Sequence, residues 1–226
     1  MNRPNYQRML DRTLQSLGNT RPRLLLHACC GPCSTYVLEY LRDYFDITLF
    51  FYNPNIQPRE EYDKRLFYLR RAAEYYGAGI LECAYDGAAF NALAKGLESA
   101  PEGGARCARC FDLRLRETAL RAREGGFDRF CSTLTVSRHK NAQVINETGE
   151  RISRETGVSW LYSDFKKRGG CDRSSALAEQ LGLYEQLWFG CGFSNVPRGK
   201  KRLPLTRELS AQPTEGEKML RCAAIV

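Results

Sequence analysis

The stretch LLLHACCGPCS, residues 24–34, joins an apolar run to three closely spaced cysteines and then to a segment with the pattern of a helix. Its first part, residues 24–28, is short and apolar, which is typical of a buried strand. A strand that leads directly into a helix is the repeating unit of parallel α/β sheets. Ligands of such sheets bind at the carboxyl ends of the strands, beside the free N–H groups of the next helix. The stretch therefore predicts a fold and places Cys29, Cys30 and Cys33 at its functional edge.

The same alternation of apolar runs and helical segments continues along the chain. Segments 58–77 and 110–126 carry apolar side chains at the three- and four-residue spacing of helices. The apolar runs that we predict as strands are LLLHA, ITLFFY, GILECA, FDRFCSTLT and VSWLY, at residues 24–28, 47–52, 79–84, 127–135 and 158–162. Because strands and helices alternate, we predict an α/β fold with a parallel sheet flanked by helices.

The length of 226 residues and the hydrophobic content of 43% are sufficient for one domain with a proper core. We predict a single α/β domain over residues 1–195, which opens with an amphipathic helix marked by Leu10, Leu14 and Leu17. Residues 196–226 are basic, contain proline and lack periodicity, so we predict a C-terminal tail there.

The chain has no stretch of the roughly 18 apolar residues that a membrane span needs, and its N-terminus is polar and charged, unlike a signal peptide. We therefore expect a cytoplasmic protein. In that reducing compartment, ten cysteines indicate metal binding or redox chemistry rather than structural disulfides. The formal charge of +8, from 34 Lys and Arg against 26 Asp and Glu, is compatible with a polyanionic partner without identifying one.

A second cysteine pair, Cys107 and Cys110 in RCARCF, lies where a long helix is predicted to begin near Phe111. Thiols at a helix start have lowered pKa values, which suits soft metal ions. Four thiolates from the two places suit a zinc ion or an iron–sulfur cluster, and the ligand types alone leave both open. The loop GPCS, residues 31–34, differs from phosphate-gripping loops, so ATP dependence is disfavoured.

Six longer motifs carry a resemblance to a known family. They are HACCGPCS, YNPNIQPREEYDKR, CARCFDLRL, FDRFCSTLTVSRHKNAQVIN, WLYSDFKKRGG and GLYEQLWFGCGFS, in that order over roughly residues 23–195. These motifs resemble the QueH family of epoxyqueuosine reductases. The resemblance implies a Rossmann-like α/β catalytic domain. It also implies removal of the epoxide oxygen of epoxyqueuosine at the wobble position of the tRNA anticodon, which gives queuosine without cobalamin.

The resemblance also implies a set of metal ligands. The family's 4Fe-4S cluster falls on four cysteines of this chain: Cys29, Cys30, Cys107 and Cys110. An additional iron beside the cluster would draw on Cys33, Cys191 and Asp164, and Cys191 and Asp164 are the predicted catalytic residues. Simpler roles stay open, because Cys33 also suits a buried helix position and Asp164 also suits a turn.

One position departs from the family pattern. The last motif of the family usually ends in a Cys-Gly-Cys pair that is taken to form a redox-active disulfide, and Phe189 occupies the first of these positions here. Removing an epoxide oxygen takes two electrons, whereas a 4Fe-4S cluster ordinarily delivers one at a time, so a neighbouring iron or thiol would store the second. We favour Cys191 acting alone as a metal ligand or electron relay. The alternatives are a pair with Cys33, Cys131 or Cys171, or a disulfide that is dispensable.

The tRNA substrate requires groups that hold an exposed base and its phosphates. The predicted substrate-binding residues are Tyr52, Asn53, Asn55, His139, Lys140, Lys166 and Lys167. The asparagines equally suit turns, and basic runs, including the one at 198–202, equally suit solvated faces. His139 and Tyr162 are candidate proton donors, although His139 also suits a phosphate contact. His27, on an apolar strand, is predicted to be a packed core histidine.

Two other functions stay open at this level. The chain could be a zinc-stabilised RNA-binding module without catalysis, or a thiol redox or sulfur-transfer protein that works through Cys29, Cys30 or Cys33. The second function leaves Cys107 and Cys110 without a role. The sequence identifies neither the electron donor nor the oligomeric state.

Overall fold

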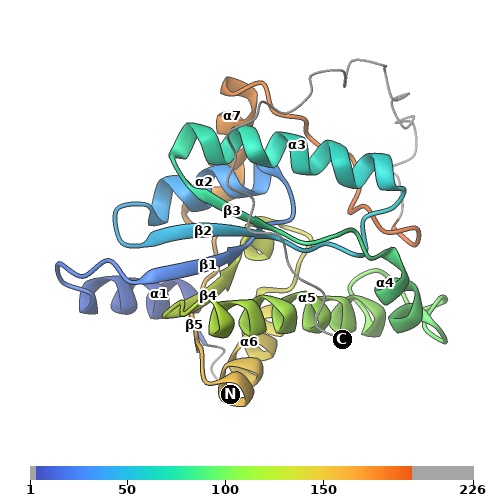
Figure 1. Cartoon of the computed structure of the whole chain (residues 1–226), viewed down its shortest axis with the longest axis horizontal. Coiled ribbons are helices and arrows are strands. Elements are labelled where there is room, and N and C mark those ends of the chain that lie inside the picture. The colour runs from blue at the N-terminus through green and yellow to red at the C-terminus, as the bar shows by residue number, and fades with distance from the viewer. Residues whose placement is uncertain (1–3, 195–226) are drawn as a thin grey trace.

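The computed structural model describes residues 4–194, which are built around one sheet of five strands (Figure 1). The strands are β1 (Arg23–His27), β2 (Asp46–Phe51), β3 (Gly79–Glu82), β4 (Arg129–Ser132) and β5 (Ser159–Trp160). Neighbouring strands all pair in parallel, in the order β3-β2-β1-β4-β5. This is the strand order of a Rossmann-like sheet. The predicted parallel α/β fold is therefore confirmed.

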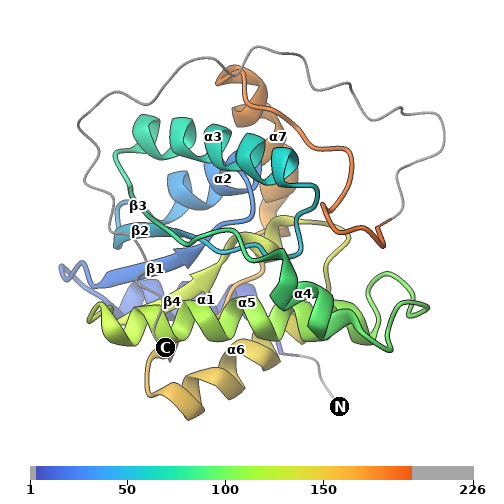
Figure 2. The ribbon, with the colours of Figure 1, turned by 45° about the vertical axis from the view of Figure 1, so that its right-hand side comes forward.

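Helices cover both faces of the sheet (Figure 2). On one face α2 (Gly31–Leu41) packs against α3 (Arg59–Tyr76) and α7 (Gly170–Gln180), and on the other α5 (Ala105–Glu124) packs against α6 (Ala142–Thr156). The remaining helical segments are α1 (Tyr6–Ser16), α4 (Gly87–Ala94), η1 (Thr133–Val136) and η2 (Lys167–Gly169). None of the helices between residues 4 and 194 combines the length and the apolarity needed to cross a membrane.

The predicted N-terminal helix lies among the described residues, whereas the predicted C-terminal tail does not. The predicted N-terminal helix is present as α1, with Leu10 and Leu14 buried and Leu17 partly buried. The predicted basic tail, residues 196–226, and the basic run 198–202 within it lie outside the described residues.

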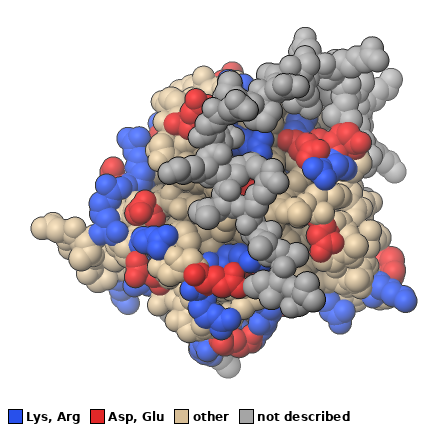
Figure 3. Space-filling view, in the orientation of Figure 1, with Lys and Arg blue, Asp and Glu red and all other residues tan. Residues whose placement is uncertain are grey.

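Charged side chains of both signs are intermixed on the face of the molecule seen in Figure 3. Many surface arginines pair with nearby carboxylates, as in Arg59–Asp63 and Arg173–Glu39. Exposed pairs of this kind contribute little to stability, about 0–1 kcal/mol each. On this face the positive charge of the chain is therefore not gathered into one patch.

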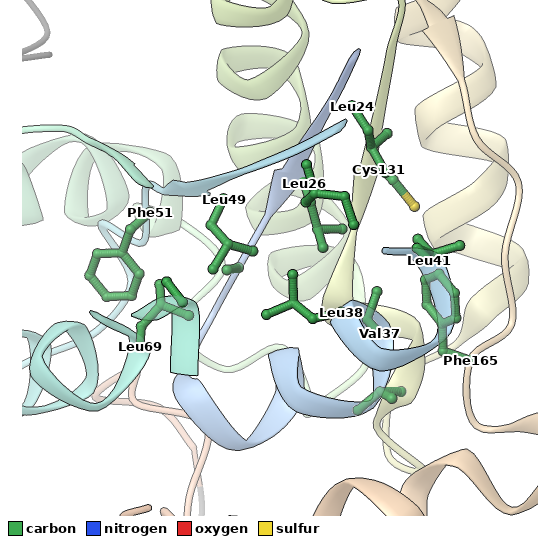
Figure 4. Packing of buried hydrophobic residues seen from close by; sticks show 14 of the residues in the cluster. Leu24, Leu26, Val37, Leu38, Leu41, Leu49, Phe51, Leu69, Cys131 and Phe165 are labelled. Atoms are coloured by element: carbon green, nitrogen blue, oxygen red, sulfur yellow. The ribbon is translucent and has the colours of Figure 1, made fainter. Parts of the chain in front are cut away.

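Successive side chains of β1 point into two separate cores. Leu24 and Leu26 pack with residues of α2 and α3 (Figure 4), whereas Leu25 packs with residues of α5 and α6. Alternate side chains of a strand face opposite sides of the sheet, so a strand covered on both sides is apolar throughout. Full burial of each such leucine stabilises the fold by about 1.5–3 kcal/mol. This double burial explains the unbroken LLL that precedes the cysteines.

Three predicted strands are shorter in the structure, and the run 79–84 is a strand only to Glu82. The run 127–135 is a strand only to Ser132, whose hydroxyl accepts a hydrogen bond from the N–H of Leu134 at 3.2 Å and turns the chain into η1. The run 158–162 pairs only as β5, at the edge of the sheet. Helix α5 begins at Ala105 rather than near Phe111, so the C-x-x-C motif lies inside its first turns.

Candidate metal centre

Three cysteine sulfurs gather at the turn between β1 and α2. The Sγ atoms of Cys29, Cys30 and Cys33 all lie within 4.8 Å of one another, and those of Cys29 and Cys30 are 3.7 Å apart. Cys30 is the N-cap of α2, and its sulfur accepts the N–H of Cys33 at 3.4 Å. Pro32 follows in the first turn, where its missing N–H is not needed. The strand-to-helix turn therefore assembles a group of soft ligands.

A cavity of about 120 Å³ connects this group with the second cysteine pair. Four cysteines from three segments line it: Cys29 after β1, Cys107 and Cys110 in α5, and Cys191 in the segment after α7. Cys191 also packs against Cys110 in a small apolar cluster with Phe90. The fold thus brings together thiols that are separated by long stretches of sequence.

Hydrogen bonds between the three neighbouring thiols shift the pKa values of Cys29 and Cys33 in opposite directions. Bonds from Cys30 and Cys33 hold the pKa of Cys29 well below its usual range, and the same contacts raise the pKa of Cys33. Burial raises the pKa of Cys30 to about 12. A thiolate at Cys29 is thus stabilised by two neighbouring thiols, which is the arrangement that a soft metal ion displaces when it binds.

The donor set suits a metal held by thiolates. All nine cysteines among residues 4–194 are free. Four of them form two pairs: Cys29, which lines the cavity, with its neighbour Cys30, and Cys107 with Cys110, which both line it. Four thiolates fit both a tetrahedral zinc ion and an iron–sulfur cluster.

Two buried arginines of α5 lie beside these cysteines and were missed by the sequence analysis. Arg106 and Arg114 are 3% and 4% exposed and line the cavity, one helical turn before and after Cys110. The Nε of Arg114 donates to the carbonyl oxygen of Cys110 at 3.3 Å, and its Nη1 to Oδ1 of Asn53 at 3.4 Å. Arg106 Nη1 donates to three carbonyl oxygens within residues 97–100. The four-residue spacing from Cys110 was the available signal.

Two carboxamides also face the cavity. Gln186, which the sequence analysis did not select, donates from Nε2 to the sulfur of Cys30 at 3.1 Å and to that of Cys33 at 3.9 Å. Its Oε1 and the Oδ1 of Asn55 are buried without a hydrogen-bond partner among the described residues. Two unsatisfied acceptors in one cavity indicate a ligand that presents N–H or O–H donors.

Comparison with known proteins decides the family. The model of the family described as "Epoxyqueuosine reductase QueH" matches residues 24–196. The chain belongs to the QueH family. It is 38% identical over 220 residues to the epoxyqueuosine reductase QueH of Streptococcus pyogenes serotype M1, which covers 92% of this chain and 86% of that protein. The QueH of Staphylococcus epidermidis is 40% identical over 205 residues, with 86% of both chains covered.

A third relative agrees with this assignment. The QueH of Thermotoga maritima is 32% identical over 188 residues, which cover 82% of this chain and 96% of that protein. Among solved structures, the U34-tRNA thiolase NcsA from Methanococcus maripaludis, with its 4Fe-4S cluster, matches with a TM-score of 0.48 and 13% identity, over 87% of this chain and 66% of that chain.

The segment that carries the departure from the QueH pattern forms one wall of the cavity. Phe189 lies with its ring centroid 5.9 Å from that of His139, and Nζ of Lys140 lies 4.6 Å from the Phe189 centroid. Arg65, itself paired with Glu61 at 2.7 Å, donates to the carbonyl oxygen of Phe189 at 3.2 Å. An aromatic ring that packs against a histidine and a lysine therefore stands where the family pattern has a thiol.

The three candidate ligands of a second iron differ in how near they lie to the cavity. Cys33 lies with Cys29, and Cys191 lines the cavity. Asp164 is 8% exposed, is not among the cavity residues, and pairs with Nζ of Lys166 at 2.7 Å. Of the other thiols considered as partners for Cys191, Cys131 is buried in the core beneath α2, where its sulfur donates to the carbonyl oxygen of Leu161 at 3.4 Å.

Only some of the predicted substrate-binding residues line the cavity. Asn55, His139 and Lys140 line the cavity. Asn53 does not; it is 1% exposed, and its Nδ2 donates to the carbonyl oxygen of Ala28 at 2.9 Å while its Oδ1 accepts from Arg114. The ring of Tyr52 stacks on Phe50, outside the cavity lining. Lys167 is exposed near η2, and Lys166 Nζ donates to the carbonyl oxygen of Lys140 at 3.5 Å.

His27 is a packed core histidine, as predicted. It is 0% exposed, and its ring nitrogens contact Ser132 Oγ at 3.0 Å and the carbonyl oxygen of Tyr52 at 3.2 Å. Burial lowers the pKa of His27 to about 3. The imidazole therefore stays neutral and ties the ends of β1, β2 and β4 together behind the cysteines.

Proposed function

We propose that the chain is an epoxyqueuosine reductase that removes the epoxide oxygen of epoxyqueuosine at the wobble position of tRNA and yields queuosine. Its 4Fe-4S cluster would be held by four cysteines: Cys29, Cys30, Cys107 and Cys110. Membership of the QueH family over residues 24–196 supports the activity. The meeting of two cysteine pairs at one cavity is the observation that carries the cluster assignment.

The bound cluster would supply electrons, and the protein's own side chains would hold the substrate beside it. The Oδ1 of Asn55 and the Oε1 of Gln186 are free to accept hydrogen bonds from the substrate. Apolar side chains that line the cavity, among them Ile56, Phe111 and Val144, would exclude water. His139, exposed and on the cavity wall, would deliver a proton to the leaving oxygen.

An additional iron and an electron-storing thiol remain part of this proposal. Cys33 and Cys191 are the side chains that would serve an iron next to the cluster, and Cys191 would be the relay in its absence. Asp164 would first have to leave Lys166. The absence of cobalamin is carried over from the resemblance alone.

The tRNA would approach over the basic residues near the cavity. Lys140 and His139 lie on its wall, and Lys166 contacts the backbone of Lys140. Positive side chains at the mouth of a cavity suit the phosphates that flank a splayed-out base. A tRNA substrate also supports the expected cytoplasmic location.

The test is anaerobic purification followed by analysis of iron, sulfide and zinc, together with an assay on tRNA that contains epoxyqueuosine under a strong reductant. Iron and sulfide in cluster stoichiometry, with conversion to queuosine, would support the proposal. Zinc without sulfide, and no conversion after reconstitution with iron and sulfide, would refute it and leave the RNA-binding module. Conversion that persists in a Cys107→Ser, Cys110→Ser double variant would favour a thiol redox protein instead.

A further inference from the structure

We propose that Arg114 is the internal countercharge of the metal group held by the cysteines, and that it is a positioning residue that sets how readily this group is reduced. The inference rests on the proposed function, because it assigns a partner to the cluster. It concerns a side chain of the motif CARCFDLRL, residues 107–115, to which the sequence analysis assigned no role.

Arg114 is a buried cation without a counterion among residues 4–194. Its side chain is 4% exposed, and none of the ion pairs formed within residues 4–194 includes it. Both of its hydrogen bonds go to neutral acceptors, the carbonyl oxygen of Cys110 and the Oδ1 of Asn53, at the long distances of 3.3 and 3.4 Å. An uncompensated buried charge is strongly unfavourable, so a negative group is expected in the space that Arg114 faces.

That space is the cavity lined by the cysteines. Arg114 lines it together with Cys29, Cys107 and Cys110, and it lies one helical turn after Cys110 on α5. The negative charge that Arg114 lacks in the protein is therefore the charge that bound thiolates would supply.

Arg114 is also tied to both halves of the ligand set. Its Nη1 bonds to Oδ1 of Asn53, whose Nδ2 donates to the carbonyl oxygen of Ala28, the residue before Cys29. Arg106, the other buried arginine of the cavity, is instead held by three carbonyl oxygens, and its charge acts on the exposed Glu98. Of the two buried arginines of α5, Arg114 is thus the one whose charge is left for the cavity.

The expected effect follows from charge. Four thiolates give the ligand set a negative charge, and reduction adds one more. A fixed positive charge in a water-poor cavity stabilises the more negative, reduced form, because charges there are weakly screened. Removal of the charge therefore makes the cluster harder to reduce.

The experiment compares three variants with the wild type. Arg114→Met removes the charge and keeps similar volume, Arg114→Lys keeps the charge, and Arg109→Met is the control, because Arg109 is exposed on the same helix. The midpoint potential of each anaerobically reconstituted protein is measured by redox titration, without tRNA. We expect Arg114→Met to reduce the equilibrium constant for reduction about tenfold or more, which is about 59 mV for one electron. The equilibrium constants for reduction of Arg114→Lys and Arg109→Met should stay within about threefold of the wild-type value.

Each outcome decides the inference. An equilibrium constant for reduction of Arg114→Met within threefold of the wild-type value would overturn it. An equal fall in this constant for Arg114→Lys would also overturn it, because shape rather than charge would then matter. If Arg114→Met folds, by circular dichroism, but holds no cluster, loading of Arg114→Lys supports the countercharge and failure of both variants overturns it. A wild-type protein that binds no iron–sulfur cluster refutes the proposed function itself, which keeps the two failures distinct.

Discussion

Gly190→Ala should loosen the segment that closes the cavity. Gly190 has a φ of +96°, which side chains with a Cβ rarely adopt. A Cβ at this position would also lie 3.0 Å from Cγ1 of Ile56 and 3.1 Å from Nη1 of Arg65. The change therefore adds backbone strain and a steric contact at a point flanked by Phe189 and Cys191.

The magnitude follows from these two effects. A residue with a Cβ in such a backbone conformation costs about 1–3 kcal/mol. The segment is held by a few contacts, among them the hydrogen bond from the N–H of Gln57 to the carbonyl oxygen of Gly190 at 2.8 Å. We therefore expect local opening rather than global unfolding. At about 1.4 kcal/mol for each factor of ten, the opened population should rise roughly 5- to 150-fold.

The assay is hydrogen exchange of the Gln57 amide, whose protection reports the bond to Gly190. Gly192→Ala is the matched control, since Gly192 lacks a positive φ and its Cβ would meet only Oε1 of Gln57, at 3.9 Å. The control should exchange like the wild type. Exchange in Gly190→Ala within twofold of the wild type would refute the reasoning.

Four further substitutions have defined outcomes. Cys107→Ser should lose the cluster and activity together, whereas Cys191→Ser should leave the cluster and lower activity; full activity in the second variant would exclude the proposed role of Cys191. Because burial lowers the pKa of His27 from 6.5 to about 3, only the unfolded chain binds this proton between those values. The free energy of unfolding should therefore fall as the pH drops below 6.5, by up to about 1.4 kcal/mol per pH unit. Urea unfolding of the apoprotein at several pH values should show a weaker dependence of this free energy on pH for His27→Gln than for the wild type. Gly149→Ala would place a Cβ 2.3 Å from the Trp160 ring and should destabilise the protein by about 1–3 kcal/mol; an unchanged melting temperature would contradict this.

The sheet was predictable because its strands are covered on both faces. Double burial makes each strand a short apolar run, and alternation with helical periodicity then fixes the parallel arrangement. The strand ends were less certain, since local hydrogen bonds decide them. Ser132 ends β4 by accepting the N–H of Leu134, and serine carries no apolar signal that would reveal this.

The cysteines of the site could be selected from sequence because clustered thiols are rare, but their surroundings could not. Arg114 and Arg116 are two residues apart on α5, and the first is buried while the second pairs with carboxylates at the surface. Arginine is mostly exposed in proteins, so the four-residue spacing of Arg114 from Cys110 was too weak a signal to place it on the buried face of the helix. The segment around Gln186 has no periodicity, and only the fold places its amide against the sulfur of Cys30.

The two cysteine pairs also have a topological consequence. Cys30 precedes α2 and Cys107 lies in α5, far apart along the chain. A metal group that bridges them would close a long loop in the unfolded chain and act as a cross-link, with the largest entropic benefit for loops of that size. Damage to the metal group by oxygen would then release this cross-link as well as end catalysis. Molecules that have lost the metal group would therefore be cleaved by proteases more readily than intact ones.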